Sequence, residues 1–101
     1  MLTTLRVVGD EITFALLVRV PVTGVERFEE YERRVLPLLD EHGGRLERRL
    51  RSPDRLTEIH IVRFESRQAF AGYREDPRRA EQAHLLSESG AAIELLEVDD
   101  A

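Results

Sequence analysis

Residues 35–64 have the sequence VLPLLDEHGGRLERRLRSPDRLTEIHIVRF. Gly43 and Gly44 follow an apolar helical pattern and suit a helix end, because glycine adopts the left-handed conformation of a C′ residue at little cost. Two strand-like runs follow, with a turn signal between them at Ser52-Pro53-Asp54. The segment therefore predicts a helix end and then a β-hairpin of residues 45–50 and 56–64, with Leu46 and Leu50 on one apolar face.

The flanking segments extend this pattern on both sides. Residues 12–20 alternate with period two, which is typical of a strand whose faces meet different surroundings. Helical spacing runs from Val25 to Leu39 and contains Pro37, which we expect to kink or tighten the last two turns. Ser66 is the predicted N-cap of a helix reaching Tyr73. A further helical turn is predicted from Pro77 to Leu86.

Residues 93–98 complete the order β-α-β-β-α-β, which is the ferredoxin-like pattern. It predicts an α+β fold with one antiparallel four-stranded sheet and the helices on one face. Residues 1–101 are then a single domain, in which residues 1–10 are a candidate extra strand or arm centred on residues 5–8.

This topology leaves one face of the sheet without helices. On residues 12–20 that face carries Ala15 and Leu17, and burying such apolar side chains is favourable. A second copy packing sheet against sheet would bury them, and a chain of 101 residues is small enough to gain from it. We therefore expect a homodimer, which is a dimeric α/β barrel.

Composition narrows the classes of partner. With 20 acidic and 15 basic residues the net charge is −5, so nucleic acid is not expected as a partner. The chain has no cysteine, which excludes disulfides and thiolate chemistry. No apolar run approaches the ~20 residues of a membrane span, and the first residues lack a signal-peptide core. We expect a cytoplasmic protein with no membrane partner.

All basic residues are arginine, which suits bidentate anion binding. A GC-rich genome explains the same bias and is the favoured explanation. An arginine cluster also occurs within residues 45–55, where charge on an edge strand protects it from aggregation.

Glu58 and His60 are candidate catalytic residues on one face of a predicted central strand. A carboxylate beside an imidazole can tune a general base. Side chains at i and i+2 on a strand are about 7 Å apart, so they bond directly only if they lean together. The alternative is a half-buried structural His60 that is bonded across strands.

Glu32 is a third candidate, because it falls among the apolar residues of the first helix. Its pKa is either raised by desolvation or lowered by an arginine of the sheet, unless the side chain extends from the edge of the apolar stripe into solvent. Phe28, Tyr31 and Tyr73 are candidate ligand-binding residues between helices and sheet, although such aromatic residues are more often core.

Arg19 and Arg63 are candidate ligand-binding residues on the mixed faces of two neighbouring strands. They either bind an anion in the barrel interior or pair with acidic residues of a partner chain, and the second is favoured. The histidines are too scattered for a metal motif, and no phosphate loop or nucleophile motif occurs. No metal or cofactor is predicted.

Three motifs stand out: LPLLDEHGGR at 36–45, RFES at 63–66 and YREDP at 73–77. On these motifs residues 12–98 resemble the dimeric α+β barrel superfamily, which includes antibiotic-biosynthesis monooxygenase-like proteins. The closest likeness is to its small bacterial proteins of uncharacterised function. The resemblance implies a homodimeric barrel and activities that include cofactor-independent oxygenation, haem degradation and isomerisation. The chain lacks the tryptophan and asparagine that are prominent in the oxygenase and haem-degrading sites.

Three hypotheses of function follow. The first is a small-molecule binder with a pocket between helices and sheet, lined by Phe28, Tyr31, Glu32, His60 and Tyr73. The second is a cofactor-independent monooxygenase or isomerase acting on an aromatic, polyketide-like substrate. The third is a non-catalytic dimeric regulatory or binding module whose polar groups satisfy one another. The sequence leaves open whether the protein is an enzyme.

Overall fold

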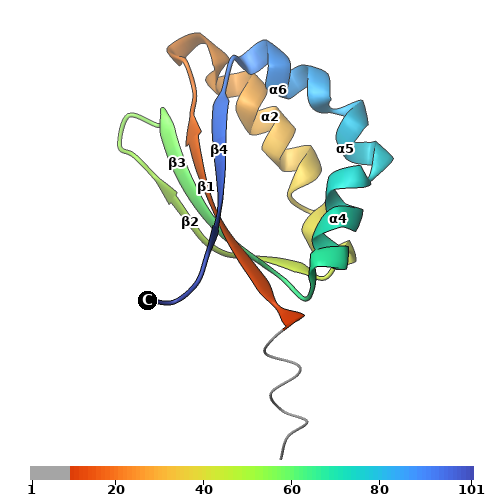
Figure 1. The fold of residues 1–101 in the computed structure, drawn as a ribbon. Coiled ribbons are helices and arrows are strands. Elements are labelled where there is room, and N and C mark those ends of the chain that lie inside the picture. The colour runs from red at the N-terminus through yellow and green to blue at the C-terminus, as the bar shows by residue number, and fades with distance from the viewer. Residues whose placement is uncertain (1–9) are drawn as a thin grey trace, which may run out of the picture.

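The computed structural model describes residues 10–101, so the candidate strand or arm at residues 5–8 lies outside the described residues. The strands form one antiparallel sheet in the order β2-β3-β1-β4, and the helices lie on one of its faces (Figure 1). The predicted α+β, ferredoxin-like arrangement is confirmed. In chain order the elements are β1 (Ile12–Arg19), a 3-10 turn (Val22–Gly24), α2 (Val25–Val35), α3 (Leu38–Glu41), β2 (Gly44–Arg51), β3 (Thr57–Phe64), α4 (Arg67–Glu75), α5 (Pro77–Glu81), α6 (Ala83–Ser89) and β4 (Ala92–Val98).

The first helix is interrupted at Pro37, as predicted. Pro37 lacks a backbone N–H, and it separates α2 from α3. Gly43 then adopts a left-handed φ of 67° just after α3. Gly44 is needed for space, because a Cβ there would lie 2.7 Å from a ring carbon of Phe64. Gly43 is thus required by the backbone conformation, and Gly44 is required by the packing of Phe64.

Side-chain caps fix the second helical segment. Ser66 caps α4, where its hydroxyl accepts a hydrogen bond from the backbone N–H of Ala69 at 3.1 Å. Asp76 caps α5 by accepting from the backbone N–H of Arg78 at 2.8 Å, with Pro77 at the first helical position. Helical structure continues past the predicted end at Leu86, because α6 reaches Ser89.

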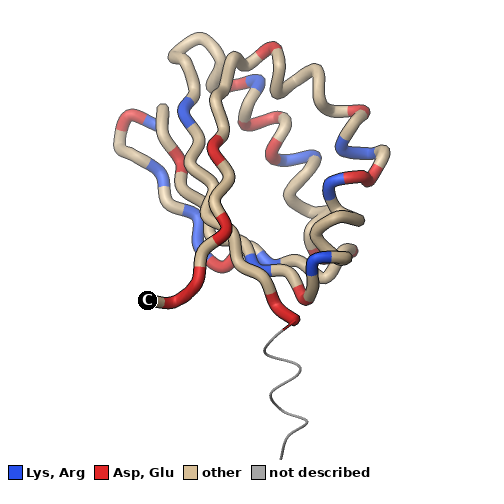
Figure 2. Tube along the Cα trace, viewed as in Figure 1, with Lys and Arg blue, Asp and Glu red and all other residues tan. Residues whose placement is uncertain are grey.

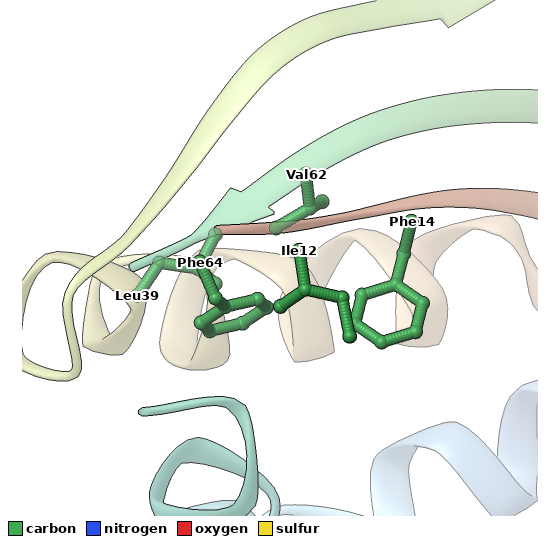
Figure 3. Packing of buried hydrophobic residues seen from close by; sticks show 5 residues of the cluster. All are labelled: Ile12, Phe14, Leu39, Val62 and Phe64. Carbon is green, nitrogen blue, oxygen red and sulfur yellow. The ribbon is translucent and has the colours of Figure 1, made fainter. Parts of the chain in front are cut away.

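The main core joins the sheet to α3 and α4. Figure 3 shows Ile12 and Phe14 from β1 packed near Val62 and Phe64 from β3, with Leu39 of α3 beside them. Aromatic packing extends this cluster, because the ring centroids of Phe14 and Phe70 are 4.3 Å apart. A second buried cluster, of Val18, Val20 and Phe28, lies at the other end of β1.

The prediction that Leu46 and Leu50 share a face of β2 was wrong. Leu46 pairs with Val62 on the core face, but a bulge between Leu46 and Arg48 shifts the register. Leu50 consequently pairs with Ile59 on the open face. Simple alternation would have turned Arg48 into the core, and the bulge instead turns Arg49 and Arg51 toward the helices.

Charged residues of both signs are interleaved along the chain trace (Figure 2). Ion pairs join many of them, such as Arg63 with Glu11 and Glu47, and Arg78 with Glu41. Within residues 10–101, no helix is both long and apolar enough to cross a membrane.

Candidate functional site

A cavity of about 300 Å³ lies between the core face of the sheet and the helices. Its walls are mostly apolar side chains of β1, α2, β3, α4 and β4. The polar side chains that line it are Tyr31, Glu32, His60, Tyr73, Arg74 and Arg79. This volume lies at the lower end of the range for small-molecule sites, which is about 300–1,000 Å³.

The structure brings the predicted pocket residues together. Phe28, Tyr31, Glu32, His60 and Tyr73 all line the cavity, as the sequence predicted. Glu58 lies behind them, and it contacts His60 rather than the cavity.

Arg19 and Arg63 lie on the other face of the sheet. They stand at opposite ends of the β1–β3 pair, where Arg19 is opposite Thr57 and Arg63 is opposite Thr13. Arg63 is paired within its own chain, because its guanidinium lies 3.0 Å from Glu11 and 2.9 Å from Glu47. The two arginines therefore do not converge on the cavity.

Glu32, Glu58 and His60 form a buried cluster on one side of the cavity. Nε2 of His60 lies 2.8 Å from Oε1 of Glu58 and 3.2 Å from Oε2 of Glu32. Glu58 and His60 lean together, so the direct hydrogen bond that strand spacing disfavours does form. All three residues are at most 4% exposed. His60 is therefore not the half-buried residue of the structural alternative, and the Glu32 side chain does not extend into solvent.

Arg49 and Arg51 supply the positive charge that holds these carboxylates. Nη2 of Arg49 donates to Oε1 of Glu32 at 2.6 Å, and its Nε donates to Oε1 of Glu58 at 3.2 Å. Nε of Arg51 donates to Oε2 of Glu58 at 3.1 Å. The sequence predicted an arginine of the sheet as one possible partner of Glu32, and Arg49 is that partner, but it did not single out Arg49 or Arg51 from the edge-strand cluster. The only indication of their role in the sequence was indirect: Glu32 and Glu58 both fall within apolar patterns, and a buried carboxylate requires a cation beside it.

The surroundings of Glu32 and Glu58 shift the pKa values of the two carboxyl groups in opposite directions. Burial opposes ionisation of Glu58, but hydrogen bonds from His60 and Arg49 outweigh it and lower its pKa to about 2. Burial raises the pKa of Glu32, although its contacts with His60 and Arg49 act in the other direction. Burial also disfavours the His60 imidazolium, yet the contacts with Glu32 and Glu58 raise the pKa of His60.

These shifts imply that Glu58 stays ionised while Glu32 and His60 compete for one proton. Oε2 of Glu32 is buried and has no hydrogen-bond partner among residues 10–101. Nε2 of His60 has a single proton, which the nearer Glu58 oxygen accepts. Glu32 therefore keeps one oxygen for a proton or a ligand.

We expect His60 to titrate above the ordinary histidine pKa of about 6.5. Since this pKa is raised in the folded state, its stabilising contribution is complete below about pH 6.5 and is lost as pH rises through the folded value. NMR titration of the ring protons of His60 measures this pKa. Glu58→Gln should lower the value for His60, and a His60 that titrates below 6.5 in the unaltered protein contradicts the assignment.

The same three residues have the spacing of a metal site, since one ligand atom from each lies within 4.8 Å of the others. Both glutamates, however, already accept hydrogen bonds from guanidinium groups. A divalent cation would have to displace Arg49 and Arg51 from their carboxylates. The donor set is therefore better suited to holding a proton than to binding a metal.

A second hollow, an open groove of about 520 Å³, runs outside the cluster between α2 and β2. Glu32 lines both this groove and the cavity. The groove also contains Arg33, Arg49, Arg51 and Arg55, and each of these already pairs with a glutamate. The inner cavity is the better ligand site because its polar groups are less completely paired.

Several solved structures share this architecture. SnoaB, a cofactor-independent oxygenase from Streptomyces nogalater, is 21% identical, with a TM-score of 0.70 over 91% of this chain and 96% of that chain. Rv0793 from Mycobacterium tuberculosis is 17% identical, with a TM-score of 0.69 over 91% of this chain and 98% of that chain. A Nitrosomonas europaea protein assigned as an antibiotic biosynthesis monooxygenase is 14% identical, with a TM-score of 0.73 over 90% of each chain.

The chain has the fold of the antibiotic-biosynthesis monooxygenases. The likeness inferred from the sequence motifs is thereby confirmed at the level of the fold. No protein-family model and no curated protein matches the sequence. This fold alone does not specify a reaction, so any activity has to be argued from the site.

Proposed function

We propose that this chain binds a small, largely apolar molecule in the cavity between the sheet and the helices. The observation that supports this most is that Glu32, His60 and Tyr73 converge on a space of about 300 Å³ that side chains leave unfilled. In a non-catalytic module with mutually satisfied polar groups, the cavity would hold no unpaired polar atom. Here Oε2 of Glu32 and Nε of Arg79 are buried without a partner among residues 10–101.

Acid–base catalysis on the bound molecule is the second candidate function. It is favoured by the position of Glu32 and His60, which both line the cavity, with Nε2 of His60 3.2 Å from Oε2 of Glu32. With Nε2–H donated to Glu58, the neutral form of His60 can accept a proton at Nδ1 from an acidic C–H or O–H group, and an isomerase would return that proton to a second atom. SnoaB shows that this fold can support cofactor-independent oxygenation. If the protein is an enzyme, we propose that it catalyses cofactor-independent oxygenation or isomerisation of an aromatic, polyketide-like substrate.

The cavity function is tested by closing the mouth of the cavity. Ile93 and Leu95 of β4 line the cavity and are each 42% exposed, so they stand at its opening. A panel of aromatic acids, phenols and quinones should contain a compound that raises the melting temperature. A ligand present at 100 times its Kd stabilises the folded protein by about 2.7 kcal/mol. Leu95→Trp should abolish the shift.

Val22→Trp is the matched control, because Val22 is 74% exposed and does not line the cavity. It should keep the full ligand-induced shift. A panel without any stabilising compound contradicts the proposal, and so does a shift that survives in Leu95→Trp.

We also propose that the open face of the sheet binds a second copy of this chain. Two apolar rows cross three strands on that face: Leu50, Ile59 and Leu17 form one, and Ile61, Ala15 and Leu96 form the other. Ile59 is 37% exposed, Leu50 41% and Leu96 49%. A face of the same chemistry would bury these side chains, with the charged residues at its rim.

Light scattering should therefore give a mass of twice 11.7 kDa at micromolar concentration. Ile59→Glu places a charge in the centre of the apolar rows, so it should shift the mass to that of a monomer. Glu94→Gln, a change of charge alone on β4, should leave the dimer intact. A monomeric unaltered protein refutes the dimer.

A further inference from the structure

Arg79 of α5 reaches into the cavity and is held there by three groups. Its guanidinium carbon lies 4.5 Å from the ring centroid of Tyr73, a cation–π arrangement. Nη2 donates to the hydroxyl of Tyr31 at 3.2 Å, and Nη1 donates to the backbone carbonyl of Arg74 at 3.4 Å. Its orientation is thus set before any ligand arrives. Nε, by contrast, is buried and has no partner among residues 10–101.

Arg79 also lacks a carboxylate partner in a chain that has an excess of acidic residues. Most arginines in residues 10–101 pair with Asp or Glu, and those that form no ion pair are Arg19, Arg48, Arg74 and Arg79. Two of these four, Arg74 and Arg79, line the cavity. Residues 1–9 contain no Asp or Glu that could supply the missing charge.

Tyr31 adds a second hydrogen-bond donor at the same place. Its hydroxyl oxygen accepts the bond from Arg79, so its own proton remains available to another acceptor. Tyr31 is only 8% exposed, and it lines the cavity with Arg79. The cavity therefore presents two oriented donors and a permanent positive charge, surrounded by apolar walls.

A purely structural Arg79 explains these observations less well. Stacking on Tyr73 accounts for the position of the guanidinium plane but leaves a buried N–H unpaired, which is costly. Arg49, by contrast, has the carboxylates of Glu32 and Glu58 beside it. The missing acceptor is best supplied by a ligand.

We propose that Arg79 and Tyr31 bind an anionic oxygen of the cavity's ligand, so that the ligand is an apolar ring system carrying one carboxylate or phenolate group. The inference rests on the proposed function and narrows it to a class of ligand. Glu32 and Glu58 disfavour an anion at their side of the cavity, so the charged group is expected beside Arg79, where the neighbouring Arg74 adds a second positive charge to the lining. The apolar body then extends along the walls toward His60.

Isothermal titration calorimetry with 2-naphthoate and the neutral 2-naphthamide tests this inference, since the two probes have nearly the same shape. The unaltered protein should bind 2-naphthoate at least tenfold more tightly. Arg79→Leu should weaken 2-naphthoate binding at least tenfold more than it weakens 2-naphthamide binding, while Arg79→Lys should retain part of the preference. Arg19→Leu is the control, because Arg19 is also unpaired but lies outside the cavity.

The outcomes separate this inference from the proposed function. Equal affinity for the two probes, or an Arg79→Leu variant with an unchanged preference, overturns the role of Arg79 while the cavity function stands. Binding of neither probe overturns both. The comparison of the two probes on the unaltered protein is decisive even if Arg79→Leu fails to fold.

Discussion

Phe64→Ala is expected to lower the free energy of unfolding by about 3–5 kcal/mol. Phe64 is 2% exposed, and its ring centroid lies 5.2 Å from that of Phe70 and 5.6 Å from that of Tyr73. The ring also fills the space that Gly44 leaves open. Truncation removes apolar contacts and leaves a cavity that the rigid glycine turn cannot close. Since small domains are stable by only about 5–15 kcal/mol, a large part of the stability is lost.

Urea denaturation followed by circular dichroism measures this loss. Val22→Ala is the control, because a residue that is 74% exposed should change stability by less than about 0.5 kcal/mol. A loss below about 1 kcal/mol for Phe64→Ala would mean that this ring is not at the centre of the core.

Glu58→Leu is expected to cost about 2–4 kcal/mol, the second largest effect. Glu58 is the common acceptor for His60, Arg49 and Arg51, and its side chain is 3% exposed. Removing it leaves three polar groups without their main partner. The side chains of Arg49 and Arg51 are 36% and 33% exposed, so water compensates part of their loss and keeps the effect below that of a fully buried pair.

Glu47→Leu provides the matched control, because Glu47 also pairs with two arginines but at the surface. Its cost should not exceed about 1 kcal/mol. The double variant Glu58→Leu/His60→Leu should recover part of the loss, since it leaves no unpaired imidazole behind. Equal costs for Glu58→Leu and Glu47→Leu would show that the cluster does not stabilise the fold.

The cost of Glu58→Leu should also depend on pH. The folded-state pKa of Glu58 is lowered to about 2, so its contribution is present above its unfolded value of about 4.5 and is lost as pH falls toward 2. The difference in stability between the unaltered protein and the variant should therefore shrink below pH 4.5. A difference that grows on acidification contradicts the assignment.

The fold was predictable because the signals that fix it are local. Pro37, Gly43 and Ser66 act through backbone conformation and capping within their own turn, so their consequences can be derived from sequence. The unusual positions of Glu32 and His60, which are buried and line the cavity, were predictable for another local reason. A charged or titratable group stood out against an apolar periodicity.

The remaining site features depend on contacts between distant segments. The bulge after Leu46 has no glycine or proline signal, and it follows from the need to keep Arg48 out of the core. Only this bulge turns Arg49 toward Glu32. Arg79 follows Pro77 in an ordinary helical turn, and its lack of a carboxylate partner depends on where the acidic side chains of distant segments lie in the fold. Sequence patterns do not encode which charges remain unpaired.

The space between the sheet and the helices is the proposed ligand site. Mapping of backbone amide chemical shifts during titration with 2-naphthoate tests it most directly. We predict that the largest changes occur at cavity-lining residues, including Phe28, His60 and Tyr73, and that the exposed Val22, which does not line the cavity, is unaffected. No change at millimolar probe, or changes confined to the open face of the sheet, would contradict the claim.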